Sequence, residues 1–263
     1  MRALQKVYKI KNAGRRFFVE NCYFLCILKN MKQTTKILVF ADVHGNYSVL
    51  EQLEKTKDYQ TADIKIFLGD AIMGFSRPND CLEFLAKNGC KCVLGNNDSY
   101  VCDHIPQVDL QEFSQEKIEQ VEFMEKLVTP QNKNFVNSWP KQLYLRFGER
   151  TLFFTHYMWE QYNQDYNVVD TPQVKSFETR QQMFESIDAD YIFFGHDHAF
   201  EYFTNNKKWF YAIGALGVKN PGEYAVVEVD EQNIKVEYKT LPSDYDKEYD
   251  LAKSAGYTLI KPR

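Results

Sequence analysis

Short apolar runs alternate with helical patterns along the chain from residue 36 to residue 94. The runs have the length of β-strands and few polar positions, which is typical of strands buried on both faces. Between them, Asn46 can cap a helix, and a second helix begins near Pro78 and can end at Gly89. This alternation predicts strands and helices in a layered α/β arrangement. The three runs are 37–41, 64–68 and 90–94.

Strand patterns dominate the later part of the chain, after a helical stretch over 103–140. In that stretch Ser114 can cap a helix with one apolar side, and Pro130 opens a polar segment. We expect this stretch to be a helical insertion near the active-site edge of the domain. Gly148 and Glu149 predict a hairpin turn between the first two of the later strands. Further helices are expected after Pro172 and over 243–254, and strands over 143–147, 151–156, 191–194, 200–204, 208–213, 223–229 and 234–240.

The composition is that of a soluble globular protein. Apolar residues make up 44% and charged residues 26% of the 263 positions, and 17 Tyr, 20 Phe and 3 Trp predict a core rich in rings. The net charge of −4 implies no basic face, so no nucleic-acid duplex is expected as a partner. Six cysteines without a C-x-x-C pair favour reduced thiols, as in a cytoplasm.

The first 30 residues differ in charge from the rest. Seven cations against Glu20 give 1–30 a net charge of +6, which leaves −4 − 6 = −10 for the remainder. The apolar run 17–28 is shorter than the ~20 residues of a membrane span. The segment also lacks the small-residue cleavage site that a signal peptide needs. The Arg15-Arg16 pair before the apolar run nevertheless leaves the interpretation as a signal peptide open. We expect a basic extension of unknown role, no membrane span, and one cytoplasmic domain over 31–263.

Side chains that can bind metals stand where five of the apolar runs end. The ends of strands in a layered sheet lie at one edge, so residues far apart in sequence can converge there. Imidazole and carboxylate donors without thiolates suit divalent Mn, Fe, Co, Ni or Zn and argue against a closed structural zinc site. Taken singly, each can be a turn, cap or core residue. The pair His196 and His198 is more specific, because alternate positions of an extended segment point the same way, and the full ordered set predicts a metal site. Its members are Asp42, His44, Asp70, Asn96, His156, His196 and His198.

The segments around these residues form an ordered series: Asp42-Val43-His44-Gly45-Asn46, Gly69-Asp70, Gly95-Asn96-Asn97-Asp98, His156 and Gly195-His196-Asp197-His198. In order and approximate spacing, the series resembles the calcineurin-like metallophosphoesterases over about 33–240. The small bacterial and archaeal phosphoesterases are most similar, because Ala71-Ile72-Met73 stands where the Ser/Thr protein phosphatases continue with Asp-Arg-Gly. The resemblance implies an α+β fold in which two sheets pack face to face with helices outside, a four-layer α/β/β/α sandwich.

The resemblance also implies a site with two divalent metal ions bridged by Asp70. Such ions, roughly 3.5–4 Å apart, activate a bridging hydroxide for in-line attack on a phosphomonoester or phosphodiester, nucleotides included. Four positive charges against two carboxylates and a hydroxide leave about +1, which attracts a small anionic ester. Asp70, Asn97 and Asp98 are the residues expected in catalysis. One ion is expected on Asp42, His44 and His198, and the other on Asn96, His156 and His196.

Asn97 departs from the pattern of the family. Many relatives have a His there that stabilises or protonates the leaving oxygen, whereas an amide donates a hydrogen bond but no proton near pH 7. We therefore expect slow turnover of esters with poor leaving groups and faster turnover of aryl esters or anhydrides. Further candidates, each with a purely structural alternative, are His104 as a replacement acid, Arg77 as a phosphate contact, and Tyr157 and Trp159 as aromatic borders of the pocket.

Two other classes of function stay open at this point. The first is a binding or scaffolding protein that uses the same fold with weak or no activity. A scaffold has no physical need for seven convergent ligands, so the full set favours catalysis. The second is a structural zinc protein, which the lack of thiolates among the candidates disfavours.

Overall fold

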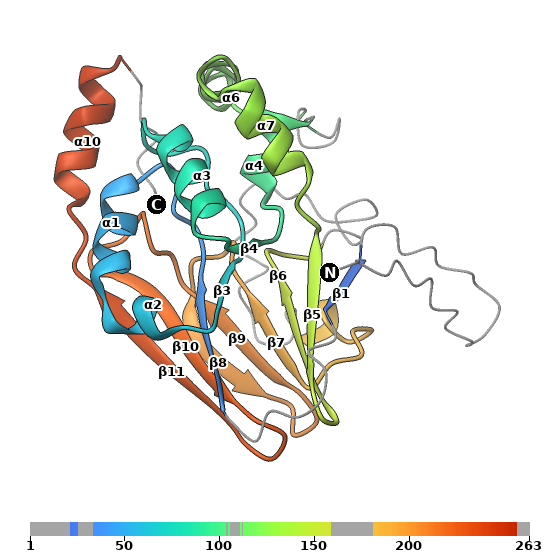
Figure 1. Cartoon of the computed structure of the whole chain (residues 1–263). Coiled ribbons are helices and arrows are strands. Elements are labelled where there is room, and N and C mark those ends of the chain that lie inside the picture. The colour runs from blue at the N-terminus through green and yellow to red at the C-terminus, as the bar shows by residue number, and fades with distance from the viewer. Residues whose placement is uncertain are drawn as a thin grey trace.

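The fold consists of two β-sheets that face each other, with helices outside. The computed structural model describes residues 22–25, 34–103, 105, 111, 113–158 and 181–256 of the chain (Figure 1). The strand order is β11-β10-β2-β3-β4 in the first sheet and β1-β5-β6-β7-β9-β8 in the second. The expected α+β class with two layered sheets is thereby confirmed.

The first sheet combines three parallel strands with an antiparallel pair. Val39 lies opposite Ile66 in parallel register on one side and opposite Ala225 in antiparallel register on the other. The parallel strands are β2 (Thr35–Phe40), β3 (Ile64–Phe67) and β4 (Lys91–Cys92), and the antiparallel pair is β10 (Gly222–Val229) and β11 (Ile234–Leu241).

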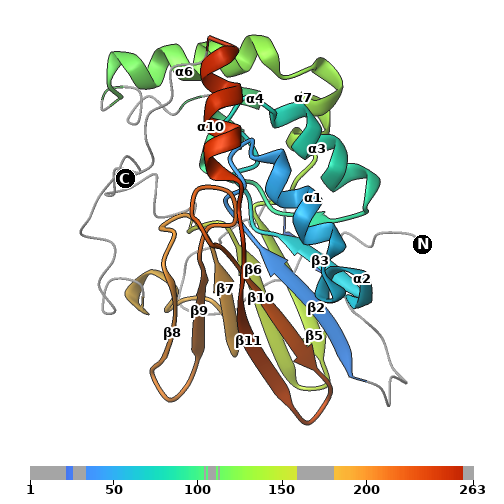
Figure 2. The same ribbon diagram turned by 90° about the vertical axis from the view of Figure 1, so that its left-hand side faces the viewer.

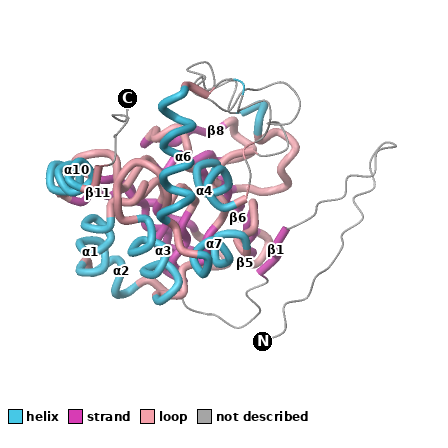
Figure 3. The backbone as a smooth tube through the Cα atoms, turned by 90° about the horizontal axis from the view of Figure 1, so that it is seen from above, coloured by secondary structure: helices cyan, strands magenta, loops and turns pink. Residues whose placement is uncertain are grey.

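The second sheet is also mixed, with β6, β7 and β9 parallel to one another. Its first two long strands form the expected hairpin, with Phe147 opposite Arg150. Cys22–Leu25 forms β1, which pairs in parallel with β5 at the sheet edge (Figure 3). The division of the chain into 1–30 and 31–263 stays a prediction. The other strands are β5 (Gln142–Phe147), β6 (Arg150–Thr155), β7 (Tyr191–Phe194), β8 (Phe200–Thr204) and β9 (Trp209–Ile213).

The helices flank the first sheet and gather at the end toward which β2 points (Figure 2). Asn46 caps the first of them through its side chain, as expected, and Ser114 caps α6 in the same way. Within the stretch expected as an insertion, α6 and α7 pack against α4. The helices are α1 (Tyr47–Lys55), α2 (Lys57–Thr61), α3 (Pro78–Lys87), α4 (Asn96–Cys102), α6 (Gln115–Leu127), α7 (Pro130–Asn137) and α10 (Tyr245–Ser254).

Alternate residues of each strand enter different layers of the core. In β2, Ile37 and Val39 pack between the sheets, whereas Leu38 and Phe40 pack against the helices. On the second sheet, Phe193 faces the space between the sheets, and its neighbours in β7 face outward. Strands buried on both faces explain the nearly continuous apolar runs of the sequence.

Two elements differ from the sequence-based expectation. A helix, α7, begins at Pro130, where a polar segment was expected, because Pro130 occupies its first turn and the Thr129 side chain accepts from Asn132 N. The buried Val136 anchors this helix. The strand expected over 90–94 is shortened to β4, and Leu94 N donates to Pro140 O instead of to a neighbouring strand.

Part of one expected helix is outside the described residues. The residues that follow Pro172, up to residue 180, are among those not described, and the described segment after them packs Phe184 and Ile187 on the outer face of the second sheet. Among the described helices, none has both the length and the apolar character needed to cross a membrane.

Candidate metal centre

The candidate ligands follow the carboxyl ends of β2, β3, β4, β6 and β7, on loops or, for Asn96, at the first residue of α4. Because β2, β3 and β4 are parallel, as are β6 and β7, these segments emerge at one end of each sheet, and contacts between ligands of the two sheets place those ends together. This is the end where α6 and α10 lie (Figure 2). The structure brings all seven predicted ligands into one cluster: Asp42, His44, Asp70, Asn96, His156, His196 and His198.

One half of the cluster is built around Asp42. Its Oδ1 atom lies 3.3 Å from His198 Nε2 and 3.6 Å from His44 Nε2. The two Nε2 atoms are themselves 3.3 Å apart. Three donor atoms from β2 and β7 loops therefore face one small volume, as ligands of a common ion do.

The other half is built around Asn96. Its Oδ1 atom lies 3.0 Å from His156 Nε2 and 2.9 Å from His196 Nδ1. Asp70 connects the two halves, because its Oδ2 is 3.4 Å from His156 Nε2 and 3.9 Å from His44 Nε2. The arrangement has two groups of donors with one shared carboxylate.

The donor set fits divalent cations. His44 Nδ1 lies 2.8 Å from Met73 O and His156 Nδ1 lies 2.7 Å from Leu68 O, so each Nδ1 carries a proton and the neutral form of each ring has its lone pair on Nε2, where a cation can bind. Asp42 Oδ1 is buried and has no hydrogen-bond partner among the described residues. A buried carboxylate oxygen without a hydrogen-bond partner lowers the stability of the fold unless a cation neutralises its charge.

The electrostatics of the cluster keep its carboxylates ionised. Burial opposes ionisation of Asp42, but His198 and His44 outweigh it and hold the pKa of the carboxyl below its usual range. Burial likewise opposes ionisation of Asp70, and His156 outweighs it, so that pKa is lowered too. For His156, burial opposes protonation, but the charge of Asp70 prevails and raises its pKa to about 9. Burial and the charge of His156 lower the pKa of His196 to about 3.

Backbone strain is concentrated in the same loops. A positive φ on a residue other than Gly is uncommon and costs about 1–3 kcal/mol, and such strain clusters at functional sites. The surrounding packing therefore stabilises the ligand loops against their local preference. The candidate ligands with positive φ are Asp42 (56°), His44 (52°), Asp70 (61°), His196 (73°) and His198 (54°).

Asp98 holds the Asp70 loop through backbone hydrogen bonds. Its carboxylate accepts from Asp70 N at 2.7 Å, Ala71 N at 2.9 Å, Ile72 N at 3.1 Å and Gly95 N at 3.2 Å. Burial and the negative charge of Asp70 raise the pKa of Asp98 to about 7, against the effect of these donors. The geometry gives Asp98 a positioning role, and its expected part in catalysis stays a prediction.

Asn97 lies directly against Asp70. Its backbone N donates to Asp70 Oδ1 at 3.0 Å, and its side-chain Nδ2 donates to Asp70 Oδ2 at 2.5 Å. The Asn97 Oδ1 atom accepts from Lys117 Nζ of α6 at 2.7 Å. Lys117 was missed by sequence reasoning, because one lysine on a charged helix has no local signal that separates it from a solvated residue.

The remaining candidates have other surroundings. Arg77 donates to Asp80 at 2.7 Å, and its guanidinium lies over the Tyr47 ring. Tyr157 is buried in the core of the second sheet, with its ring 4.4 Å from that of His196. His104 and Trp159 are outside the described residues.

Gly95 is the residue at which the loops of Asp70 and Asp98 meet. A Cβ at this position would overlap Asp70 Oδ1 and Asp70 N, and would lie 2.9 Å from Asp98 Oδ2. We expect Gly95→Ala to reduce stability by about 1–3 kcal/mol. Because Asp70 must move, we also expect it to weaken Mn²⁺ binding in calorimetric titration. Gly89→Ala is the control, since its Cβ would meet no atom within 4 Å, and it should leave Mn²⁺ affinity unchanged.

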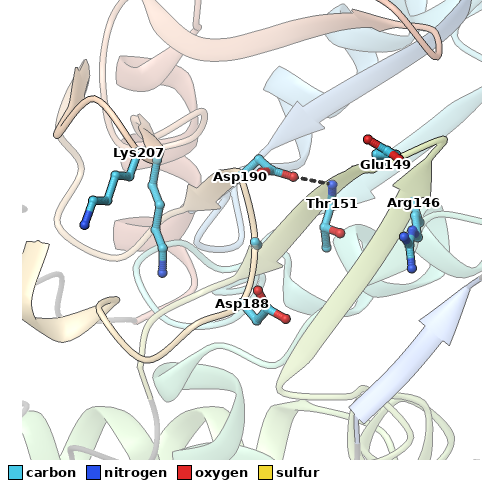
Figure 4. Close-up of a pocket in the computed structure, with 8 residues that line it drawn as sticks. Arg146, Glu149, Thr151, Asp188, Asp190 and Lys207 are labelled. Carbon is cyan, nitrogen blue, oxygen red and sulfur yellow. Dashed lines mark hydrogen bonds between the residues drawn. The ribbon is translucent and has the colours of Figure 1, made fainter.

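A separate crevice of about 350 Å³ lies at the opposite end of the second sheet (Figure 4). It is bordered by the amino ends of β6 and β7, whereas the candidate ligands follow their carboxyl ends. Asp190 is already used there as an acceptor for Thr151 N at 2.8 Å. The crevice is lined by both acidic and basic side chains, so it does not resemble the metal cluster with its carboxylate and imidazole donors. The labelled lining residues are Arg146, Glu149, Thr151, Asp188, Asp190 and Lys207.

Comparisons with known proteins bear on the family and on the fold of this chain. Residues 35–232 match the sequence model of the calcineurin-like phosphoesterase superfamily domain. The uncharacterized protein MJ0912 of Methanocaldococcus jannaschii is 25% identical in an alignment of 241 residues that covers 81% of this chain and 90% of that protein. Two solved structures share the fold. A metallophosphoesterase from Sphaerobacter thermophilus has a TM-score of 0.65 and 19% identity, with 86% of this chain and 96% of that one covered. The hypothetical protein PH1004 from Pyrococcus horikoshii OT3 has a TM-score of 0.69 and 15% identity, with 85% and 94% covered.

Proposed function

The chain belongs to the calcineurin-like phosphoesterase superfamily, and from this premise we propose that it is a dinuclear metal-dependent hydrolase of small phosphate esters. Its substrates are phosphomonoesters or phosphodiesters, with nucleotides among the candidates. The observation that carries the proposal is the buried Asp42 Oδ1, which has no hydrogen-bond partner among the described residues and faces two imidazole Nε2 atoms at 3.3 and 3.6 Å. A divalent cation is the group that satisfies all three atoms.

The proposed ligands divide into two sets that share Asp70. When bound, the two ions supply positive charge for the phosphoryl oxygens and make a water acidic enough to act as the nucleophile. The mixed oxygen and nitrogen donors suit Mn, Fe, Zn, Ni or Co. Asp42, His44 and His198 hold one ion, and Asn96, His156 and His196 hold the other.

The chain's own residues orient the reacting groups. His44 and His156 are fixed in one tautomer by the carbonyls of Met73 and Leu68, so their Nε2 atoms stay directed into the site. Asn97 can donate a hydrogen bond to a substrate oxygen but supplies no proton near neutral pH. Esters whose leaving groups need no proton, such as aryl esters and anhydrides, should therefore react faster than alkyl esters.

The proposed location is the cytoplasm. Among the described residues, Cys81, Cys90, Cys92 and Cys102 are all free thiols. Free thiols are typical of a reducing compartment.

The decisive experiment measures hydrolysis by the purified full-length chain. We expect turnover of bis(4-nitrophenyl) phosphate or 4-nitrophenyl phosphate with added Mn²⁺, loss of turnover with a chelator, and recovery when Mn²⁺ is restored. Analysis of metal content should give two ions per chain.

Two outcomes would contradict the proposal. Two bound ions without hydrolysis of any mono-, di- or cyclic phosphate ester under several divalent ions would favour a scaffold of the same fold. Hydrolysis that persists unchanged after complete metal removal would exclude a metal-dependent reaction.

A further inference from the structure

Helix α6 sends one lysine to the metal cluster. Lys117 lies in the first turn of this helix, which Ser114 caps by accepting from Lys117 N. Its Nζ atom donates to Asn97 Oδ1 at 2.7 Å, and Asn97 Nδ2 in turn donates to Asp70 Oδ2 at 2.5 Å. A chain of two hydrogen bonds thus joins an ammonium group on α6 to the carboxylate shared by the two halves of the site.

These two neighbours determine how the Asn97 amide is turned. A lysine ammonium only donates hydrogen bonds, so it must face the amide oxygen. The ionised Asp70 carboxylate only accepts them, so it must face the amide nitrogen. Both contacts therefore require the same orientation, in which the N–H groups of Asn97 are directed into the site.

The ammonium group is itself held in place. Lys117 Nζ lies 5.9 Å from the Tyr100 ring centroid and 5.8 Å from that of Phe113, at the outer limit for a cation–π contact. The two rings contact each other edge to face at 5.1 Å, and both are buried. A half-buried cation with fixed surroundings keeps more of its electrostatic effect than a freely moving surface lysine.

A charged donor on the amide oxygen also changes the amide nitrogen. Hydrogen bonds in a chain polarise one another, so an ammonium on Oδ1 makes the N–H groups of Asn97 stronger donors. Hydrogen bonds to charged groups are also roughly twice as strong as neutral ones. Asn97 in this setting is a better partner for an anion than an isolated amide.

We propose that Lys117 is a positioning residue that orients and polarises the Asn97 amide, so that the Nδ2–H not donated to Asp70 binds a phosphoryl oxygen of the substrate. The inference rests on the proposed function, because it takes a phosphoryl group as the ligand of the cluster. It assigns a role in that site to the helical stretch 103–140.

The test is a double-mutant cycle with inorganic phosphate as the probe. Calorimetric titration of phosphate into the Mn²⁺-loaded full-length protein should give a Kd about tenfold higher for Lys117→Met and for Asn97→Ala than for the parent. In the Asn97→Ala background, adding Lys117→Met should change the Kd less than about twofold, because the lysine acts through the amide. Lys117→Arg should recover part of the affinity.

Lys126→Met is the matched control, since Lys126 is exposed near the end of the same helix. It should leave the Kd and the melting temperature at parental values. An unchanged Kd in Lys117→Met, additive effects in the double mutant, or a parent that binds no phosphate would each overturn the inference. Ester hydrolysis by the parent is measured separately. A parent that binds phosphate in a Lys117-dependent way but cleaves no ester would overturn the proposed function alone.

Discussion

Replacement of Asp70 by Ala should reduce kcat/KM for an aryl phosphodiester by at least about 10³-fold, which corresponds to about 4 kcal/mol of transition-state stabilisation. Asp70 Oδ2 lies within 4 Å of His156 Nε2 in one half of the cluster and of His44 Nε2 in the other, so a single carboxylate oxygen faces an imidazole nitrogen of each half. Without it, the first set keeps Asp42 as its carboxylate, the second set has only imidazole and amide donors, and the shared negative charge is lost. We therefore expect the metal content to fall below two ions per chain.

The measurement combines steady-state kinetics with metal analysis. Asp188→Ala is the control, because Asp188 is exposed and lies at the opposite end of the second sheet, beside the crevice of Figure 4. It should retain parental activity and metal content. His196→Ala should lose activity as well, since His196 contacts Asn96 in the second half of the site. Activity of Asp70→Ala within about tenfold of the parent would show that chemistry occurs elsewhere.

The strands and the positions where they end could be predicted from the sequence, because burial on both faces of a sheet produces continuous apolar runs. Asp42 and Asp70 stand out in the sequence because each ends such a run. Parallel strand order brings the loops of each sheet to one end of that sheet. The convergence of His196 and His198 with Asp42 and Asp70, more than 120 residues away, also requires the two sheets to face each other with these ends together.

Other features depend on tertiary contacts that leave no local pattern. The segment Gly95-Asn96-Asn97-Asp98 has the composition of a turn, yet α4 begins within it, because Asp98 Oδ2 accepts from Gly95 N at the start of the helix. The sequence of helix α7 is mostly polar, and a few buried residues such as Val136 pack this helix against the rest of the protein. Lys117 is recognisable only when α6 is packed on α4.

Asp98 illustrates how a residue selected from the sequence can also have a positioning role that the sequence does not indicate. The resemblance to the family implies a part for Asp98 in catalysis, and that part stays a prediction. In the structure its two oxygens are engaged by backbone N–H groups of residues 70–72 and 95. Those donors are 26 to 28 residues away, or on the preceding turn, and spacing alone cannot indicate them.

Asp98→Ala should therefore be among the most destabilising substitutions in the chain. Four buried N–H groups would lose their acceptor, and an unsatisfied buried donor costs about 1–3 kcal/mol. Allowing for water that enters the space left behind, we expect the free energy of unfolding to fall by at least about 3 kcal/mol. Urea unfolding followed by circular dichroism measures this directly.

Asp63→Ala is the matched control, because Asp63 is exposed and its carboxylate accepts a hydrogen bond from one backbone group, Lys36 N, at 2.8 Å. Its loss should cost less than about 1 kcal/mol. If Asp98→Ala folds, Mn²⁺ binding should weaken, since Asp70 N, Ala71 N and Ile72 N no longer share an anchor. Asp98→Asn separates charge from shape, because its amide can accept from some of these donors but places an NH₂ group against the others. A parental unfolding free energy in both Asp98 variants would mean that the ligand loops are held by packing and not by this carboxylate.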